Sequence, residues 1–285
     1  MRGSLFFHTG RMVKFLISAL ILSLLVLLVL TFKYPNLPKV IVYKVFREYA
    51  RFSMTWKTRH WQEIEGEKFI LRFQPGDENV GKMVLDTAEE AYGPVNTALN
   101  YNPKEKIPII LYPDNLALNR SFGWAANESA MGVYWAGVIR ILSPNYWIEE
   151  EDMEERFRSE GPMAHEYAHF IVDYIAGGNY PRWLTEGIAQ QVERKVTGFE
   201  MALTGGTEVY SIDQMDKEFD LLPNQSAAYR QSLAMIDFLV NEYGEDALGN
   251  ILQALGKGEN LDRAFKESIA LDVKGFENKF LDSLN

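Results

Sequence analysis

The chain has 285 residues, of which 47% are hydrophobic and 24% are charged, and it contains no cysteine. The absence of cysteine excludes thiolate ligands from any metal site. Residues 1–61 carry ten Lys or Arg and a single acid, whereas the remainder carries 19 basic and 38 acidic side chains. The net charge of −19 beyond residue 61 argues against nucleic acid as a partner.

The first expected element is a transmembrane anchor at residues 13–34, after a short N-terminal tail at residues 1–12. The eighteen residues from Phe15 to Phe32 are apolar apart from three hydroxyl side chains, and this length is near the minimum that spans the hydrocarbon core as a helix. A cleaved signal peptide is the competing interpretation. Its hydrophobic region would be unusually long, and no small residues suited to cleavage follow. We therefore expect an uncleaved, single-pass anchor.

Residues 35–65 form a juxtamembrane segment in which basic side chains alternate with aromatic ones. Such a segment can lie along anionic lipid headgroups with its aromatic rings at the interface. It can equally be a solvated helical stalk, and the sequence leaves both interpretations open. The aromatic residues are Tyr43, Phe46, Tyr49, Phe52, Trp56 and Trp61.

A globular domain is expected over residues 66–285. Alternating or continuous apolar patterns predict strands at residues 68–74 and 109–112, and a strand or hairpin at 132–142 around Ala136-Gly137. A helix is expected over 77–99, interrupted at Pro94. An acidic run at 149–155 precedes a helix that Gly161-Pro162 opens. Further helices are predicted at 183–196, 227–243, 245–256, 260–269 and 273–284.

The motif His165-Glu166-Tyr167-Ala168-His169 is an HExxH sequence. Positions i and i+4 of a helix share one face, so His165 and His169 can bind one metal ion together. Glu166 lies about 100° further round the helix, where it can reach a water molecule at the metal. Chance occurrence or two core histidines would explain the same letters. However, the chain has only 4 histidines, and two of them stand at the ligand spacing.

The third ligand is expected to be a carboxylate, because no histidine follows His169 and no cysteine exists. Glu186 is the best candidate. It follows a turn-forming loop at residues 177–181, which can bring a second helix back to the metal. The alternative for Glu186 is an ordinary first-turn glutamate that faces the positive end of the helix dipole. Glu193, two turns further along, is the fallback ligand.

The sequences HEYAH and WLTEGIA together resemble the glutamate-ligand zincins, or gluzincins, and in particular the peptidase-MA-like group. This resemblance implies a zinc ion held by His165, His169 and Glu186, with Glu166 as general base. It also implies an α+β, zincin-like metallopeptidase domain behind the transmembrane helix. That domain would combine a small mixed sheet, whose edge strand receives substrate, with the HExxH helix and a helical C-terminal part.

Two departures from the thermolysin-type pattern stand out. The Asp that supports a zinc histidine four residues after the ligand glutamate is replaced by Gln190, whose amide oxygen could accept an imidazole N–H. The downstream histidine that stabilises the oxyanion is missing. We expect a tyrosine in that role, with Tyr229 as the candidate and Tyr210 and Tyr243 as competitors.

The sequence therefore predicts a membrane-anchored zinc peptidase that hydrolyses peptide bonds through a zinc-bound water, with Glu166 as general base. Its partners would be a peptide or protein substrate and membrane lipid, the latter contacted by the anchor and the basic segment. The alternatives are a catalytically silent zincin-fold binding module and a hydrolase of a non-peptide amide. Counting basic residues around the anchor favours a cytoplasmic domain. The family resemblance implies an extracytoplasmic one at the cell membrane, and this is our expectation.

Overall fold

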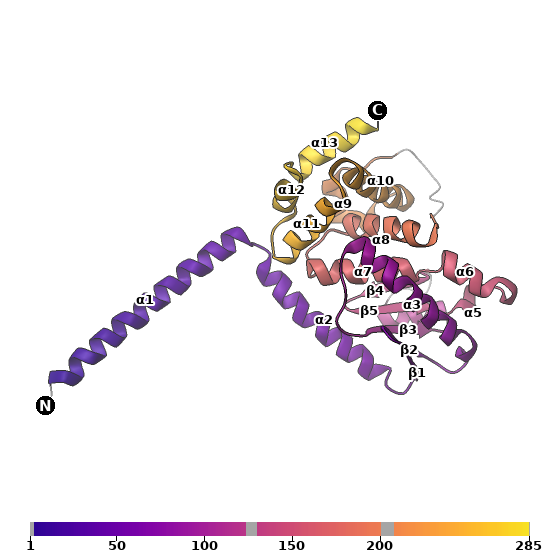
Figure 1. The fold of residues 1–285 in the computed structure, drawn as a ribbon, viewed down its shortest axis with the longest axis horizontal. Helices are drawn as coiled ribbons and strands as arrows, with labels where there is room; N and C mark the ends of the chain where they lie inside the picture. Colours follow the sequence, from indigo (N-terminus) through magenta and orange to yellow (C-terminus); the bar gives the residue numbers. More distant parts are fainter. Residues whose placement is uncertain (1–2, 124–129, 201–207, 285) are drawn as a thin grey trace.

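A five-stranded sheet lies inside the domain, and helices surround it (Figure 1). The structure is a computed structural model that describes residues 3–123, 130–200 and 208–284. The expected mixed α+β class with a small sheet and a mostly helical remainder is confirmed. The strands are β1 (Gln62–Glu65), β2 (Phe69–Phe73), β3 (Ile107–Tyr112), β4 (Gly132–Trp135) and β5 (Val138–Leu142).

The strand order is β1-β2-β3-β5-β4, so β1 and β4 form the two edges. The β2–β3 and β3–β5 pairs are parallel, whereas β1 and β4 pair antiparallel with their neighbours. Parallel strands are normally buried on both faces, which explains the continuous apolar run in β3. One face of the sheet packs against α3 (Glu78–Leu99) and α7 (Met163–Ala176), and the other contacts α4 (Asn115–Phe122).

The hairpin expected at residues 132–142 is confirmed. Ala136 and Gly137 join β4 to β5, with φ values of 46° and 85°. Two successive positive φ values are characteristic of the tight two-residue turn that matches the twist of a hairpin. The hairpin places β4 at the edge of the sheet, next to α7.

Two expected features of the predicted elements were wrong, namely the interruption of a helix at Pro94 and the start of a strand at residue 109. The helix α3 continues through Pro94 without interruption. Pro94 is exposed, so water can satisfy the carbonyl that loses its amide partner there. The strand β3 begins at Ile107 and includes Pro108, because the parallel pairing with β2 starts one residue before the proline.

The helices that carry most of the C-terminal half agree with the predicted segments to within two residues. They are α8 (Arg182–Thr197), α10 (Gln225–Tyr243), α11 (Glu245–Gly256), α12 (Leu261–Ile269) and α13 (Val273–Ser283). The acidic run forms the short helix η1 (Glu150–Asp152) and begins a separate helix, α6 (Met153–Glu160). The sequence patterns did not predict β1, α4, α5 (Pro144–Trp147), α9 (Ile212–Glu218) or η2 (Phe219–Leu221).

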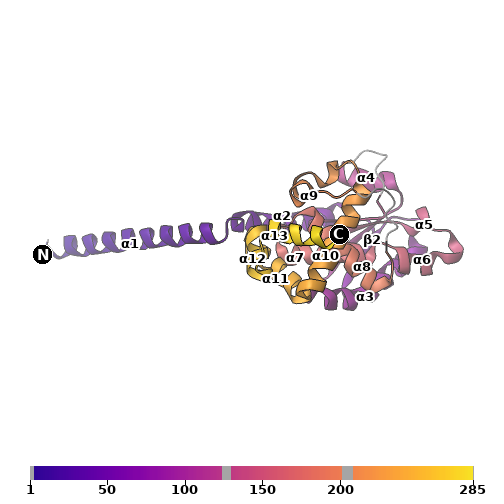
Figure 2. The same ribbon diagram turned by 90° about the horizontal axis from the view of Figure 1, so that it is seen from above.

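The helix α1 (Gly3–Lys33) projects away from the domain (Figures 1 and 2). Its segment Lys14–Lys33 is long and apolar enough to cross a membrane, with a mean hydropathy of 2.9. At Pro35 the chain turns into α2 (Leu37–Lys57), which lies along the domain. The bend is attached to the domain, because the Asn36 N–H donates to the Gly258 carbonyl (2.8 Å) and the Arg263 guanidinium to the Lys33 carbonyl (3.2 Å).

The juxtamembrane segment is therefore not a free stalk. One face of α2 buries Val40, Ala50 and Met54 against the domain. The Arg47 guanidinium donates to the fully buried carboxylate of Asp173 on α7 (3.1 Å) and stacks on the ring of Tyr174 at 3.6 Å. The strand β1, which ends at Glu65, also pairs with β2. The folded domain thus includes residues that precede position 66.

Candidate metal centre and active site

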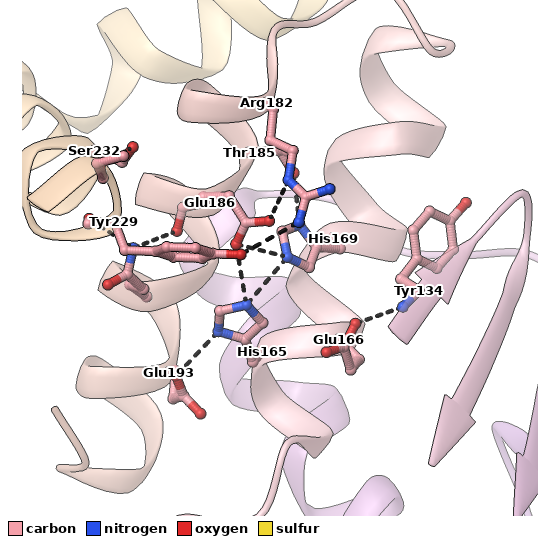
Figure 3. Close-up of polar contacts among 12 residues, drawn as sticks. Tyr134, His165, Glu166, His169, Arg182, Thr185, Glu186, Glu193, Tyr229 and Ser232 are labelled. Carbon is pink, nitrogen blue, oxygen red and sulfur yellow. Dashed lines mark hydrogen bonds and ion pairs between the residues drawn. The ribbon is translucent and has the colours of Figure 1, made fainter. Parts of the chain in front are cut away.

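Three side chains from two helices meet beside the sheet. The HExxH residues lie on α7, and Glu186 lies in the second turn of α8. The helix α7 ends at Gly177, whose φ of 62° stops it, and the loop to Pro181 turns the chain so that α8 packs back on α7. The side chains of His165 and His169 on α7 and of Glu186 on α8 thereby lie close together (Figure 3).

The geometry of these three side chains fits one metal ion. The His165 and His169 Nε2 atoms lie 3.1 Å apart, and each lies 3.5 Å from the same oxygen of Glu186. A tetrahedral ion with bonds of about 2.05 Å would separate its ligand atoms by about 3.3 Å. The triangle therefore matches the size that such an ion requires. Two imidazoles and one carboxylate also form a donor set that leaves a fourth position open for catalysis.

The second nitrogen of each imidazole is held by a neighbour on α8. The Nδ1 atom of His165 lies 3.0 Å from a carboxylate oxygen of Glu193, and the Nδ1 atom of His169 lies 2.7 Å from the Thr185 hydroxyl. These contacts hold both rings with their Nε2 atoms toward the common point. The Glu193 carboxylate accepts hydrogen bonds, so it favours the proton on Nδ1 of His165. Glu193, the fallback ligand, thus contacts a histidine and does not join the triangle.

The expected role of Gln190 was wrong. Its amide donates to the backbone carbonyls of Glu186 (3.2 Å) and Tyr229 (3.0 Å), and the structure gives it no contact with either histidine. Gln190 faces α10, where its amide contacts the Tyr229 carbonyl. Glu193, nearly two full turns beyond Glu186, faces α7 and contacts the His165 ring.

Glu166 lies beside the edge strand β4. Its carboxylate accepts a hydrogen bond from the Tyr134 N–H at 2.5 Å, and only 6% of the residue is exposed. Burial raises the pKa of Glu166 above its usual range, although His165 and His169 act in the opposite direction. Gly132 leaves room for this carboxylate, because a Cβ atom there would lie 2.7 Å from the Glu166 Cγ atom.

The candidate ligand Glu186 is buried, with 6% of the residue exposed. Burial alone would raise its pKa, but His169 and His165 outweigh that effect and hold the pKa well below its usual range. The second oxygen of Glu186 forms an ion pair with Arg182 one turn earlier on α8, at 3.2 Å. Arg182 thus contacts the outer side of the cluster.

Tyr229 reaches from α10 toward the two histidines (Figure 3). Its hydroxyl oxygen accepts a hydrogen bond from Arg182 at 3.2 Å. Burial and the negative charge of Glu186 raise the pKa of Tyr229 to about 12, so the hydroxyl remains a donor at neutral pH. The competitor Tyr210 has its hydroxyl on the Asn224 N–H (3.0 Å), and Tyr243 lies at the far end of α10.

Comparison with known families adds an independent finding. The model of the Peptidase MA superfamily matches residues 95–285, which is more than half of the chain and includes α7, α8 and α10. The chain belongs to the Peptidase MA superfamily. The zincin-like form expected from the two motifs is consistent with this family, and so is a site that could hold a metal ion.

One curated relative extends the similarity beyond the segment that matches the superfamily. The uncharacterized protein YhcO of Bacillus subtilis (strain 168) is 20% identical over 250 residues, which cover 78% of this chain and 71% of the relative. The name of this relative assigns no activity to it. The activity of this superfamily member must therefore be argued from its own residues.

Sequence reasoning missed three residues that contact the candidate site. Arg182 and Thr185 precede Glu186 on the same helix, and Tyr134 lies on β4. The spacing of Arg182, four residues before Glu186, was the available signal, because an i,i+4 pair of opposite charge meets on one helix face. No sequence signal identified Tyr134, since its contact with Glu166 spans 32 positions.

Proposed function

We propose that this protein is a membrane-anchored zinc peptidase of the glutamate-ligand type. The observation that carries the proposal is the triangle of His165, His169 and Glu186, whose edges of 3.1, 3.5 and 3.5 Å match the ligand separation at a tetrahedral zinc ion. The membership in the Peptidase MA superfamily supports a peptidase-like hydrolase. A bound zinc ion would supply an electrophile for the scissile carbonyl and would lower the pKa of a water molecule.

Glu166 is the general base in this proposal. Its carboxylate is buried beside the triangle but belongs to neither of the pairs that hold the histidines. Burial raises its pKa, which suits a carboxylate that must accept a proton from the attacking water and return it to the leaving amine. The Tyr134 N–H holds the carboxylate in position until a substrate enters.

The edge strand β4 is the proposed substrate-binding strand. The Leu142 N–H donates to the Met131 carbonyl, so the alternation of an antiparallel ladder turns the backbone groups of Gly132 and Tyr134 away from β5. Among the described strands, only β5 pairs with β4. An extended peptide could therefore add to this edge, with main-chain hydrogen bonds that are independent of its sequence.

Tyr229 and Arg182 are the proposed donors to the oxyanion. Replacing Tyr229 with phenylalanine removes one hydroxyl with little change in volume. Loss of one such donor typically reduces turnover about 10²–10³-fold. We expect the lower end, about 10²-fold in kcat with a small change in KM, because Arg182 remains 3.2 Å from Glu186. Tyr210→Phe is the matched control and should retain full kcat. Unchanged kcat in Tyr229→Phe would remove this residue from the mechanism.

The metal assignment is tested by His169→Ala in the full chain. We expect one zinc ion per wild-type chain by metal analysis, and loss of stoichiometric zinc in the variant, because two ligands cannot replace the triangle. His60→Ala is the control, since His60 is exposed and lies outside the cluster. Activity on a peptide library should disappear with a chelator and return with zinc. Full zinc content in His169→Ala would reject the assignment.

The proposed location is the cell membrane, with α1 as a single-pass anchor and the catalytic domain on the extracytoplasmic side. The apolar segment Lys14–Lys33 supports the anchor. The side of the membrane follows from the family resemblance, and protease protection of the domain in sealed vesicles would test it.

A further inference from the structure

The outer face of α2 is apolar, and the described part of the chain leaves it exposed. Its side chains are between 41% and 68% exposed, although exposed apolar residues in a monomer are usually scattered. The stripe points away from Val40, Ala50 and Met54, which face the domain. The stripe consists of Ile41, Val42, Val45, Phe46, Tyr49, Phe52 and Trp56.

The same helix carries three exposed lysines and one exposed acid, Glu48, on a domain that is otherwise acidic. Lys39, Lys44 and Lys57 are exposed, as is Arg59 just beyond the helix. Residues beyond position 61 carry a net charge of −19. An apolar stripe flanked by cations is the arrangement of a helix that lies in the plane of an anionic lipid interface.

The short connection between α1 and α2 determines how the outer face of α2 is oriented toward a bilayer that α1 crosses. Only three residues separate the end of the candidate span at Lys33 from the start of α2. The bend between them is held by Asn36 on Gly258 and by Arg263 on Lys33. Figure 1 shows that α2 turns across the direction of α1, with the domain on the side of α2 opposite to α1. A bilayer crossed by α1 would therefore meet the outer face of α2.

The apolar stripe is continuous with the proposed substrate-binding strand. The ring of Phe46 packs against Trp135 at the end of β4, with the centroids 5.5 Å apart, and Trp135 is 45% exposed. The other end of β4, Gly132, lies beside Glu166. Gly132 and Trp135 are three residues apart, which corresponds to about 10 Å along a strand. The edge of β4 therefore extends about 10 Å from the proposed general base to α2.

We infer that the outer face of α2, together with Trp135, lies in the lipid interface, and that the site cleaves polypeptides anchored to the same membrane close to its surface. The substrate part rests on the proposed peptidase function, whereas the lipid contact does not. A substrate strand paired with β4 leaves the domain beside the Phe46–Trp135 contact, which is at the lipid surface in this arrangement. Peptide bonds of the substrate that lie near the membrane surface are therefore the favoured cleavage sites.

The lipid contact is tested without any activity measurement. The chain has no cysteine, so one introduced cysteine is a unique labelling site. Val45→Cys, Phe52→Cys and Trp135→Cys would each carry an environment-sensitive fluorophore in the full chain. The chains would be reconstituted in phosphatidylcholine vesicles with and without phosphatidylglycerol. We expect blue-shifted emission and quenching by lipid-borne nitroxides at all three positions, strongest with the anionic lipid.

Tyr146→Cys is the matched control, because Tyr146 is 52% exposed on α5, at the far side of the domain from α1 in both views (Figures 1 and 2). Its label should remain in water. Emission typical of water at positions 45 and 52 would overturn the lipid contact, whatever the activity of the protein.

The substrate class is tested with lipid-anchored peptides that share one cleavable sequence and differ in spacer length. A five-residue spacer reaches about 17 Å when extended. If α2 stood upright as a stalk, its 21 residues would hold the site about 30 Å away, beyond that reach. We expect cleavage of the five-residue peptide by the wild type and at least a tenfold loss in the double variant Val45→Asp, Phe52→Asp.

The same unanchored peptide in solution separates this inference from the proposed function. The double variant and the control Tyr146→Asp should cleave it at the wild-type rate, because the altered side chains are exposed and distant from the metal ligands. Equal loss of soluble and anchored cleavage in the double variant would overturn the substrate inference. Absence of soluble cleavage in the zinc-loaded wild type would instead reject the peptidase proposal and leave the label result to decide the lipid contact.

Discussion

Replacing Glu166 with glutamine is expected to leave the protein folded and zinc-loaded but to reduce kcat between about 10²- and 10⁴-fold. The amide has the shape of the carboxylate, yet it cannot accept a proton from the attacking water. It can still accept the hydrogen bond from the Tyr134 N–H, so the local structure should persist. The measurement is kcat on a cleaved peptide together with zinc content.

Glu160→Gln is the matched control, because it makes the same chemical change on α6, in a side chain that is 41% exposed and lies outside the cluster. Near-normal kcat in zinc-loaded Glu166→Gln would reject the general-base role. Loss of zinc in that variant would show instead that Glu166 supports the triangle. The silent-module alternative predicts no turnover in the wild type, so the wild-type rate decides between it and the enzyme.

The second large effect concerns the buried pair of Arg47 and Asp173. Replacing Arg47 with methionine is expected to lower the free energy of unfolding by about 3–5 kcal/mol, because it leaves a buried carboxylate without its cation. Asp173 is 0% exposed, and its hydroxyl partners, which include Tyr134 (2.5 Å) and Tyr180 (3.1 Å), are neutral. Denaturant unfolding of the detergent-solubilised full chain measures the loss.

Lys44→Met is the control for this experiment, because it removes one positive charge from the exposed face of the same helix. It should change the free energy of unfolding by less than about 0.5 kcal/mol. Adding Asp173→Asn to Arg47→Met should restore part of the lost stability, since the uncompensated charge is then gone. If the losses of stability in the single variants Arg47→Met and Asp173→Asn simply add up in the double variant, the buried ion pair is contradicted.

The features that depend on spacing within one helix could be predicted from the sequence. The i,i+4 relation of His165 and His169 requires only a helix, and histidine and cysteine counts left a carboxylate as the third ligand. The loop at residues 177–181 made the return of Glu186 plausible, and the structure brings it to 3.5 Å from both imidazoles. The later helices were predictable because their apolar stripes are regular.

The features that depend on how elements cross could not be predicted. Whether Gln190 or Glu193 meets a histidine depends on which face of α8 turns toward α7, and the sequence contains no signal for that rotation. Arg47 resembles the other basic residues of its segment. Its partner Asp173 lies 126 positions away, so the packing of α2 on the domain was not apparent.

Gly132 provides a way to interpret other chains that carry HExxH. A Cβ atom at this position would lie 2.7 Å from Glu166 and 2.8 Å from Pro162, so any larger residue would displace the proposed base or the start of its helix. A relative that retains both histidines and both glutamates but has a bulky residue at the equivalent position would hold metal without room for a working base. The residue at the edge strand can therefore help to separate active members from binding-only members, which the HExxH motif alone cannot do.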